Sequence, residues 1–445
     1  MFRNLINAFK NKEIRNKILI TIGLLFIYRL GCWLPIPGIS GEALIAESDT
    51  LMNLMSQIGG NALANGAFLA LGISPYINAS IIVQLLTVAI PALERWSRQG
   101  EDGRKKIALV TKIATLALAI LQAVGIAISW VQGGGISDGI FTAQDSQVWI
   151  AVFVAAMLVA GSMVTMWLGD RITELGVGNG ISLIIFVGIV ASAGLAIAGS
   201  IEQIVAGGED GTMAFWGLLI FLLLVILIFL FIVFIDLSER KIVVNYAKQV
   251  KGRKQYGGQS SNIPIKVNAN GVLPIIFSTA ILTLPQMIAR MFASTESLGD
   301  TSTFYGWWTT YLGTDSILYF VLLGVLIMAF SFFYTTIQFK PDEIARNLQQ
   351  YGGSIQGIRP GKATAEYLNK VSKRLTFWGA LFLMIIAIVP SVVFQALQTA
   401  GVISNMDLIN AFTATGLLIV VSVALELNKQ LEGLLMMKRT RGFLK

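Results

Sequence analysis

The chain has 445 residues, of which 55% are hydrophobic and 13% are charged, and its mean hydropathy is +0.72. Soluble domains carry about 25% charged residues, so this composition predicts an integral membrane protein instead. Histidine is absent and Cys32 is the single cysteine, which excludes disulfides within the chain, His/Cys metal sites and histidine-dependent catalysis. We therefore expect no enzymatic activity, no cofactor and no metal.

Ten stretches are long and apolar enough to cross a bilayer, which takes about 20 residues. They lie near 18–34, 72–90, 107–130, 148–168, 179–199, 213–235, 271–291, 315–337, 375–396 and 406–427. A basic, amphipathic segment precedes the first stretch and lacks the pattern of a cleavable signal peptide. Ten spans return the carboxyl end to the side of the amino end.

Lys and Arg gather in alternate gaps between these stretches, with Arg290 as the one exception. The gap 35–70 carries no Lys or Arg, whereas the next gap carries five. Membrane proteins keep basic residues on the cytoplasmic side, so we expect the basic gaps and both termini to be cytoplasmic. This placement also accounts for the formal net charge of +8 without a nucleic-acid partner.

Two basic gaps, 236–270 and 338–374, are long and carry seven Lys or Arg each. Orientation needs only a few charges, so the surplus favours a docking surface for a large partner, although topology or anionic lipid would also account for it. Alternation over Lys241–Tyr246 predicts a strand or hairpin in the first gap. The second gap opens at Pro341 with the pattern of a short helix.

A short repeat divides the chain into two halves of five spans, 1–205 and 206–445. Gly72-Ile-Ser-Pro75 and Gly271-Val-Leu-Pro274 each open the second span of a half. Because five is odd, the halves would have opposite topology, and such inverted repeats place a pathway at the interface between halves.

Two Gly-rich segments invite a functional interpretation. Leu51–Ala70 is uncharged and rich in Gly and Ala, so we expect a buried re-entrant segment instead of an ordinary surface loop. Gly176-Val-Gly-Asn-Gly180 resembles part of a dinucleotide fingerprint, but no strand precedes it, and we expect a short turn.

The spans contain few ionisable groups near their centres, which coupled transporters need. Branched aliphatic residues meeting at mid-membrane would form a dry constriction, and small hydroxyls could join two helices by weak hydrogen bonds. Ordinary helix packing explains these residues equally well. A secondary transporter of a small solute with an inverted repeat, and a structural scaffold for membrane complexes, remain alternatives to a channel.

Six motifs carry a resemblance to a known family over essentially the full length: Leu34–Ile39, Ala70–Leu86, Ile172–Ser182, Arg240–Lys248, Pro264–Asn268 with Gly271–Pro274, and Ile358–Gly361. The chain resembles the SecY family of protein-conducting channels. Asn270 departs from the family pattern, in which a small apolar residue is usual. The resemblance implies an all-α membrane protein with two pseudo-symmetric inverted halves, closed like a clamshell around an hourglass pore. Such a channel translocates unfolded secretory polypeptides and releases hydrophobic segments into lipid through a lateral gate.

The resemblance also implies roles for individual residues. The pore ring would consist of Ile77, Ile81, Ile185, Ile189, Ile276 and Ile419. The plug, at about 59–67, would include Gly60, Asn61, Ala62, Leu63, Ala64 and Asn65. The lateral gate would contain Ser80, Gln84, Thr87, Ser278, Thr279 and Thr283. The leading contacts for a motor or ribosome would be Lys251, Arg253, Lys254 and Arg359.

The partners implied by the resemblance are SecE-type and SecG-type small subunits, the SecA ATPase motor and the ribosome. Signal peptides, nascent chains and membrane lipids would be bound transiently. The implied location is the bacterial inner (plasma) membrane, which the chain would cross several times.

Overall fold

The computed structural model describes most of the chain: residues 9–39, 62–63, 65–132, 146–206, 209–246, 249–251, 254–256, 260–268, 271–292, 304–313, 316–399 and 414–443. The chain divides into two compact units, each built from separate segments. The first unit comprises Met1–Phe221, Ala280–Ser316 and Leu397–Lys445. The second unit comprises Leu222–Thr279 and Ile317–Ala396.

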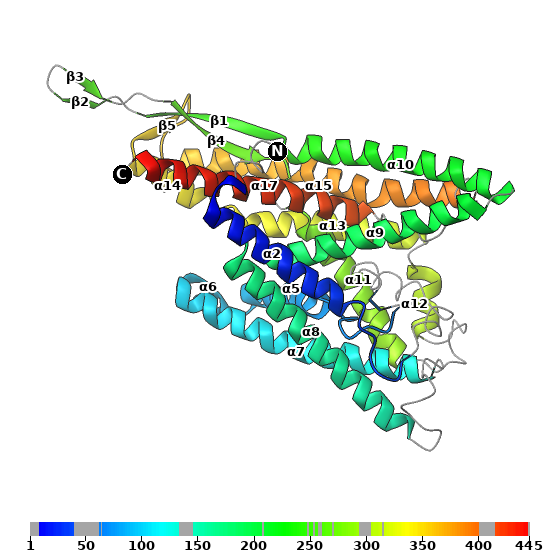
Figure 1. Cartoon of the computed structure of the whole chain (residues 1–445). Coiled ribbons are helices and arrows are strands. Elements are labelled where there is room, and N and C mark those ends of the chain that lie inside the picture. The colour runs from blue at the N-terminus through cyan, green and yellow to red at the C-terminus, as the bar shows by residue number, and fades with distance from the viewer. Residues whose placement is uncertain are drawn as a thin grey trace. The chain divides into compact units, whose positions relative to one another are not determined.

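A helix lies at each of the ten expected spans (Figure 1). These helices are α2 (Lys12–Gly31), α5 (Ser74–Ala89), α7 (Glu101–Gln132), α8 (Gln147–Leu175), α9 (Gly180–Ala206), α10 (Glu209–Asp236), α11 (Leu273–Phe292), α13 (Ile317–Gln338), α15 (Lys362–Thr399) and α17 (Ala414–Phe443). Shorter helices are α6 (Pro91–Arg98), α12 (Phe304–Leu312) and α14 (Pro341–Gln350). In the described part of the chain, six helices are long and apolar enough to cross a membrane, or seven if the bent pair formed by α5 and α6 is one span. The helical membrane fold is confirmed, and the number ten stays a prediction.

The break between α5 and α6 has a local cause. Ile90 is extended, with φ −104° and ψ 115°, and Pro91 begins α6. A proline ring disfavours helical geometry in the residue before it, so the first helix ends and the second starts at an angle of 103°.

The two Gly-x-x-Pro segments have the same local structure. Gly72 has φ +53° and Gly271 has φ +60°, in the left-handed region that glycine enters without a steric penalty. In each case a helix begins two residues later, and the proline lies in its first turn. The predicted local repeat is confirmed, whereas the division into halves at residue 205 stays a prediction.

Both long basic gaps contribute to one small sheet in the second unit, which we name the loop sheet. Its strands are β1 (Glu239–Tyr246), β4 (Ser260–Lys266) and β5 (Gly353–Ile355), in the order β4-β1-β5 (Figure 1). Both pairings are antiparallel. The strands β2 (Gln249–Lys251) and β3 (Lys254–Tyr256) form a separate hairpin. The predicted strand at Lys241–Tyr246 and the predicted helix at Pro341 are both confirmed.

The loop sheet has its own hydrophobic core. Alternation along β1 buries Val244 completely and leaves Val243 47% exposed, as expected for a strand with one covered face. The core also includes residues of α14 and of the first turns of α15. Its buried members are Ile242, Val244, Ile265, Leu348, Ile355, Leu368 and Val371.

Candidate functional site

Four predicted ring residues from three helices pack in one hydrophobic cluster of the first unit, and we name them the aliphatic cluster: Ile77, Ile185, Ile189 and Ile419. Ile185 and Ile189 lie one turn apart on α9 and are buried, while Ile77 of α5 and Ile419 of α17 are partly buried against them. Residues four apart share one face of a helix, so α9 presents a continuous aliphatic surface here.

The other two ring candidates lie outside this cluster. Ile81 is 4% exposed and lies one turn after Ile77 on α5. Ile276 is half-buried near the start of α11 and belongs to the second unit.

The described part of the predicted re-entrant segment is buried. Ala62, Leu63 and Ala67 are each at most 1% exposed, and Ala62 and Ala67 belong to the same hydrophobic cluster as the four isoleucines. Asn65 is exposed. The remaining plug candidates, Gly60, Asn61 and Ala64, lie outside the described residues.

Backbone hydrogen bonds fix this segment against the chain that follows α2. The amide of Ile36 donates to the carbonyl of Gly66 at 2.9 Å, and the amide of Phe68 donates to the carbonyl of Leu34 at 2.8 Å. Pro35 and Ala67 form an isolated antiparallel bridge between them. The Leu34–Ile39 motif therefore supplies the backbone partner of the buried segment.

Four hydroxyls of the lateral-gate candidates form hydrogen bonds within their own helices. Those of Thr87, Ser278, Thr279 and Thr283 donate to carbonyls of their own helices, at 2.7–3.3 Å. A hydroxyl has one proton to donate, so none of these four donates to another helix in this structure. The role of these residues in a lateral gate stays a prediction. Of the other gate candidates, Ser80 is half-buried and Gln84 is exposed.

Sequence reasoning missed one amide and one ion pair in the first unit. Gln122 on α7 is 1% exposed, and its side-chain nitrogen and oxygen have no hydrogen-bond partner among the described residues. A buried amide without a partner costs about 1–3 kcal/mol, so a glutamine is unusual in the middle of an apolar stretch. That contrast with its neighbours is the sequence signal that could have pointed to Gln122. Lys112 of α7 and Asp170 of α8 form a salt bridge at 2.6 Å, although each lies within or next to an expected span.

The docking candidates lie on or beside strands of the second unit. Lys251 ends β2 and Lys254 begins β3, and the two are paired in register across the hairpin. Arg359 is exposed between β5 and α15, and its carbonyl accepts a hydrogen bond from the Thr364 hydroxyl at 2.9 Å. Arg253 lies outside the described residues.

The Gly176–Gly180 motif forms a packed turn between α8 and α9. The amide of Val177 donates to the Thr21 hydroxyl at 3.0 Å, and the amide of Gly180 donates to the Thr173 hydroxyl at 2.8 Å. The predicted turn at Gly176–Gly180 is confirmed. Among the described residues, no group of three or more His, Cys, Asp or Glu is placed to hold a metal ion.

The comparisons with known proteins agree with this architecture. A family model, SecY, matches residues 67–428. The protein translocase subunit SecY of Escherichia coli (strain K12) is 40% identical over 440 residues, covering 97% of this chain and 94% of that protein. The SecY of Halalkalibacterium halodurans is 37% identical over 455 residues, covering all of both chains.

Solved structures show the same fold. A structure of a protein-conducting channel matches with a TM-score of 0.67 and 19% identity, covering 94% of this chain and 91% of that chain. Sec61 in a canine ribosome–channel complex matches with a TM-score of 0.63 and 18% identity, with the same coverage.

The helices that are long and apolar enough to cross a membrane, together with these full-length relatives, define a multi-pass membrane protein of the channel class. The family model matches more than half of the chain, and this identifies the family. The chain belongs to the SecY family, and it is a subunit of a protein-conducting channel. Membership favours this function over the small-solute transporter that the sequence left open.

Proposed function

We propose that the aliphatic cluster, together with Ile81 and Ile276, forms the constriction of the channel, and that the re-entrant segment is the plug that closes it. The observation that carries this proposal is the packing of Ala62 and Ala67 in the hydrophobic cluster that holds isoleucines from α5, α9 and α17. One solved structure with this fold belongs to a study of how the plug domain of SecY stabilises the closed state and maintains a membrane seal.

The constriction would block ions because it is narrow and lined by apolar side chains. Branched aliphatic side chains bind water poorly, so a narrow ring of them excludes hydrated ions when the pore is empty. The same side chains can change rotamer and pack around an unfolded polypeptide of any sequence, because apolar packing is non-directional. Hydrophobic segments would leave sideways, between α5 and α7 on one side and α11 and α13 on the other.

The orientation and the partners follow from the charged loops. We propose that the loop sheet and both termini are cytoplasmic in a bacterial plasma membrane, as the distribution of Lys and Arg indicates. A ribosome or a SecA motor would dock on these two basic loops, through Lys251, Arg253 and Lys254 at the hairpin of β2 and β3 and through Arg359 beside the loop sheet. Two structures with this fold are ribosome complexes, of canine Sec61 and of yeast Ssh1, which supports the ribosome as a partner. SecE-type and SecG-type subunits would complete the complex.

The constriction can be tested by conductance in reconstituted vesicles. We expect Ile189→Asn to raise the resting ion conductance severalfold and to allow export with weaker signal sequences, because an amide lets water enter the dry ring. Ile226→Asn is the matched control, since Ile226 is 59% exposed on α10. Equal conductance in Ile189→Asn and the wild type would falsify the assignment.

A further inference from the structure

The hairpin of β1 and β4 is closed at its base by buried polar contacts. Past the last register pair, Glu239 with Lys266, the amide of Val267 donates to the carbonyl of Ser238 at 3.1 Å. Beyond it, the Asn268 side-chain amide donates to the Asp236 carboxylate at 3.3 Å. The pairing therefore continues from the strands down to the end of α10.

The outermost of these contacts is buried, which is unusual for a carboxylate. Asp236 is 8% exposed and Asn268 is 5% exposed. A carboxylate taken out of water is costly unless a donor compensates it, and the Asn268 amide supplies that donor here. The pair therefore defines how the two ends of the hairpin enter the helices.

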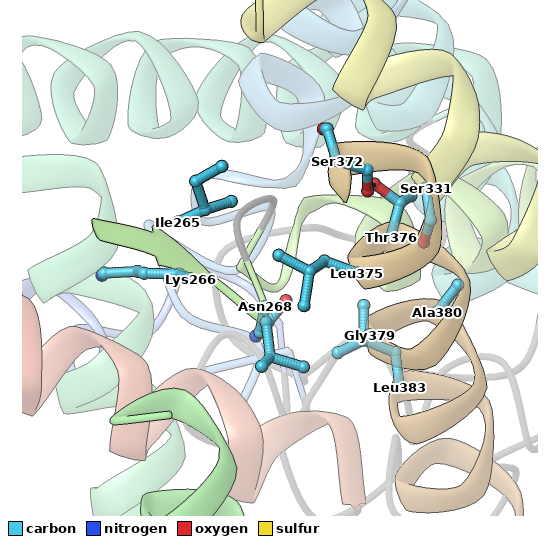
Figure 2. Close-up of a pocket in the computed structure, with 11 residues that line it drawn as sticks. Ile265, Lys266, Asn268, Ser331, Ser372, Leu375, Thr376, Gly379, Ala380 and Leu383 are labelled. Atoms are coloured by element: carbon cyan, nitrogen blue, oxygen red, sulfur yellow. Dashed lines mark hydrogen bonds between the residues drawn. The ribbon is translucent and has the colours of Figure 1, made fainter. Parts of the chain in front are cut away.

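The base of the hairpin rests directly on α15. A Cβ atom at Gly379 would collide with the carbonyl oxygen of Val267, so this helix position has to be glycine for the strand end to approach. Figure 2 shows Asn268 and Gly379 lining the same pocket. The pocket leaves about 10 Å³ free, which is at the lower limit for a single water, so the contact is close-packed and offers no ligand site.

Two hydroxyls at the same pocket bring α15 and α13 into contact. The Thr376 hydroxyl of α15 lies 3.1 Å from the Thr335 hydroxyl of α13, while each donates to a carbonyl of its own helix, that of Ser372 at 2.9 Å and that of Ser331 at 2.8 Å. Ser331 of α13 and Ser372 of α15 line the pocket (Figure 2). A displacement of the hairpin base would therefore reach both helices.

The hairpin itself is suited to carry a displacement. Seven register pairs join β1 to β4, and the second basic gap is attached to β1 through β5. Because the sheet has its own buried core, a force on any of its strands moves it as one body.

We propose that Asp236 and Asn268, seated on Gly379, form a coupling joint that transmits partner binding at the loop sheet to α13 and α15. Both are positioning residues and lie away from the docking surface. The inference rests on the proposed docking function. It adds that docking and channel opening can be separated by substitution at the joint.

Asn268→Ala tests the joint, and Asn262→Ala is its matched control, since Asn262 is an exposed asparagine on β4. Proteoliposomes containing the complete channel complex are mixed with ribosomes that carry a secretory nascent chain. Binding is measured by flotation, and opening is measured by protection of the nascent chain from protease. We expect Asn268→Ala to bind ribosomes within about twofold of wild type and to lose most of the protection, whereas the control keeps both.

A second pair of variants tests whether the effect of Asn268→Ala comes only from misfolding. Gly379→Ala should reproduce the uncoupling, because its methyl group pushes the Val267 carbonyl off α15. Gly194→Ala on α9 is the control, since a Cβ there meets nothing within 4 Å. The exchange of the pair, Asp236→Asn with Asn268→Asp, keeps one donor and one acceptor and should restore protection.

The outcomes separate this inference from the docking proposal. Loss of ribosome binding and protection together would show that the joint only maintains the docking surface, and wild-type protection in both Asn268→Ala and Gly379→Ala would exclude a coupling role. Failure of the docking proposal would give a different result: ribosome binding would be unchanged when Lys251, Arg253, Lys254 and Arg359 are all replaced by Glu, and this would also overturn the joint, which would have no input to transmit.

Discussion

The aliphatic cluster and the loop sheet are stabilised by different kinds of interaction. The cluster collects isoleucines from α5, α9 and α17 and uses packing alone. The loop sheet is fixed by backbone hydrogen bonds in a defined register. Packing has no preferred direction, so it can open and close again, whereas a hydrogen-bonded register resists sliding. The difference suits the proposed constriction, which has to open, and the proposed docking surface, which has to keep its shape.

Both apolar packing and backbone hydrogen bonds hold the predicted re-entrant segment in place. Its apolar side chains join the hydrophobic cluster, while its backbone is paired with Leu34 and Ile36 by hydrogen bonds. Movement of the segment out of the cluster therefore has to break a few directional bonds as well as apolar contacts. If the segment is the plug, as we propose, breaking these bonds contributes to the energy cost of opening.

The largest effect should come from a charge in the core of the loop sheet. We expect Val244→Asp to destabilise the sheet by more than about 3 kcal/mol, because an unpaired carboxylate would be buried. Ribosome binding should be lost, while the resting conductance stays at the wild-type level. Limited proteolysis and flotation measure the two effects. Val243→Asp, on the exposed face of the same strand, is the control, and equal damage in both variants would contradict the register.

A smaller effect should follow from adding one methyl group beneath the re-entrant segment. A Cβ at Gly161 on α8 would collide with the carbonyl of Phe68. We expect Gly161→Ala to cost about 1–3 kcal/mol and to raise the resting conductance, since overpacking displaces the segment. Thermal unfolding of the purified complex measures the first effect. Gly199→Ala, where a Cβ meets nothing within 4 Å, should be neutral or slightly stabilising.

Charge reversal on the docking surface should act on function without changing stability. Arg359→Glu is expected to reduce partner-driven export severalfold, because an exposed cation that contacts the partner becomes an anion. The resting conductance should not change. Arg104→Glu, at an exposed position of α7, controls for the change in net charge. Normal export by Arg359→Glu would remove this residue from the docking surface.

The smallest effect is expected at the gate hydroxyls. Thr279→Val removes a hydroxyl that donates to carbonyls of its own helix, so stability should change by less than about 1 kcal/mol. Export with a standard signal sequence should also be unchanged. A clear shift in signal-sequence stringency would show instead that this hydroxyl finds a partner on another helix when the channel opens.

The sequence by itself determined those features that depend on local chemistry. The length of the apolar stretches set the helices, and the order of prolines and glycines set their ends at Ile90, Gly72 and Gly271. Alternation along β1 predicted a strand with one buried face. The distribution of Lys and Arg singled out two loops among several. Each of these features depends on residues close together in the chain.

Tertiary structure alone decided which residues meet. It joined β5 to β1, so that two loops separated by α11, α12 and α13 share one sheet. It placed Ile189 and Ile419 in a common cluster, turned the gate hydroxyls toward their own helices, and buried Gln122 and Asp236. Such contacts depend on how distant surfaces fill space against each other, and composition and spacing do not encode that fit one residue at a time.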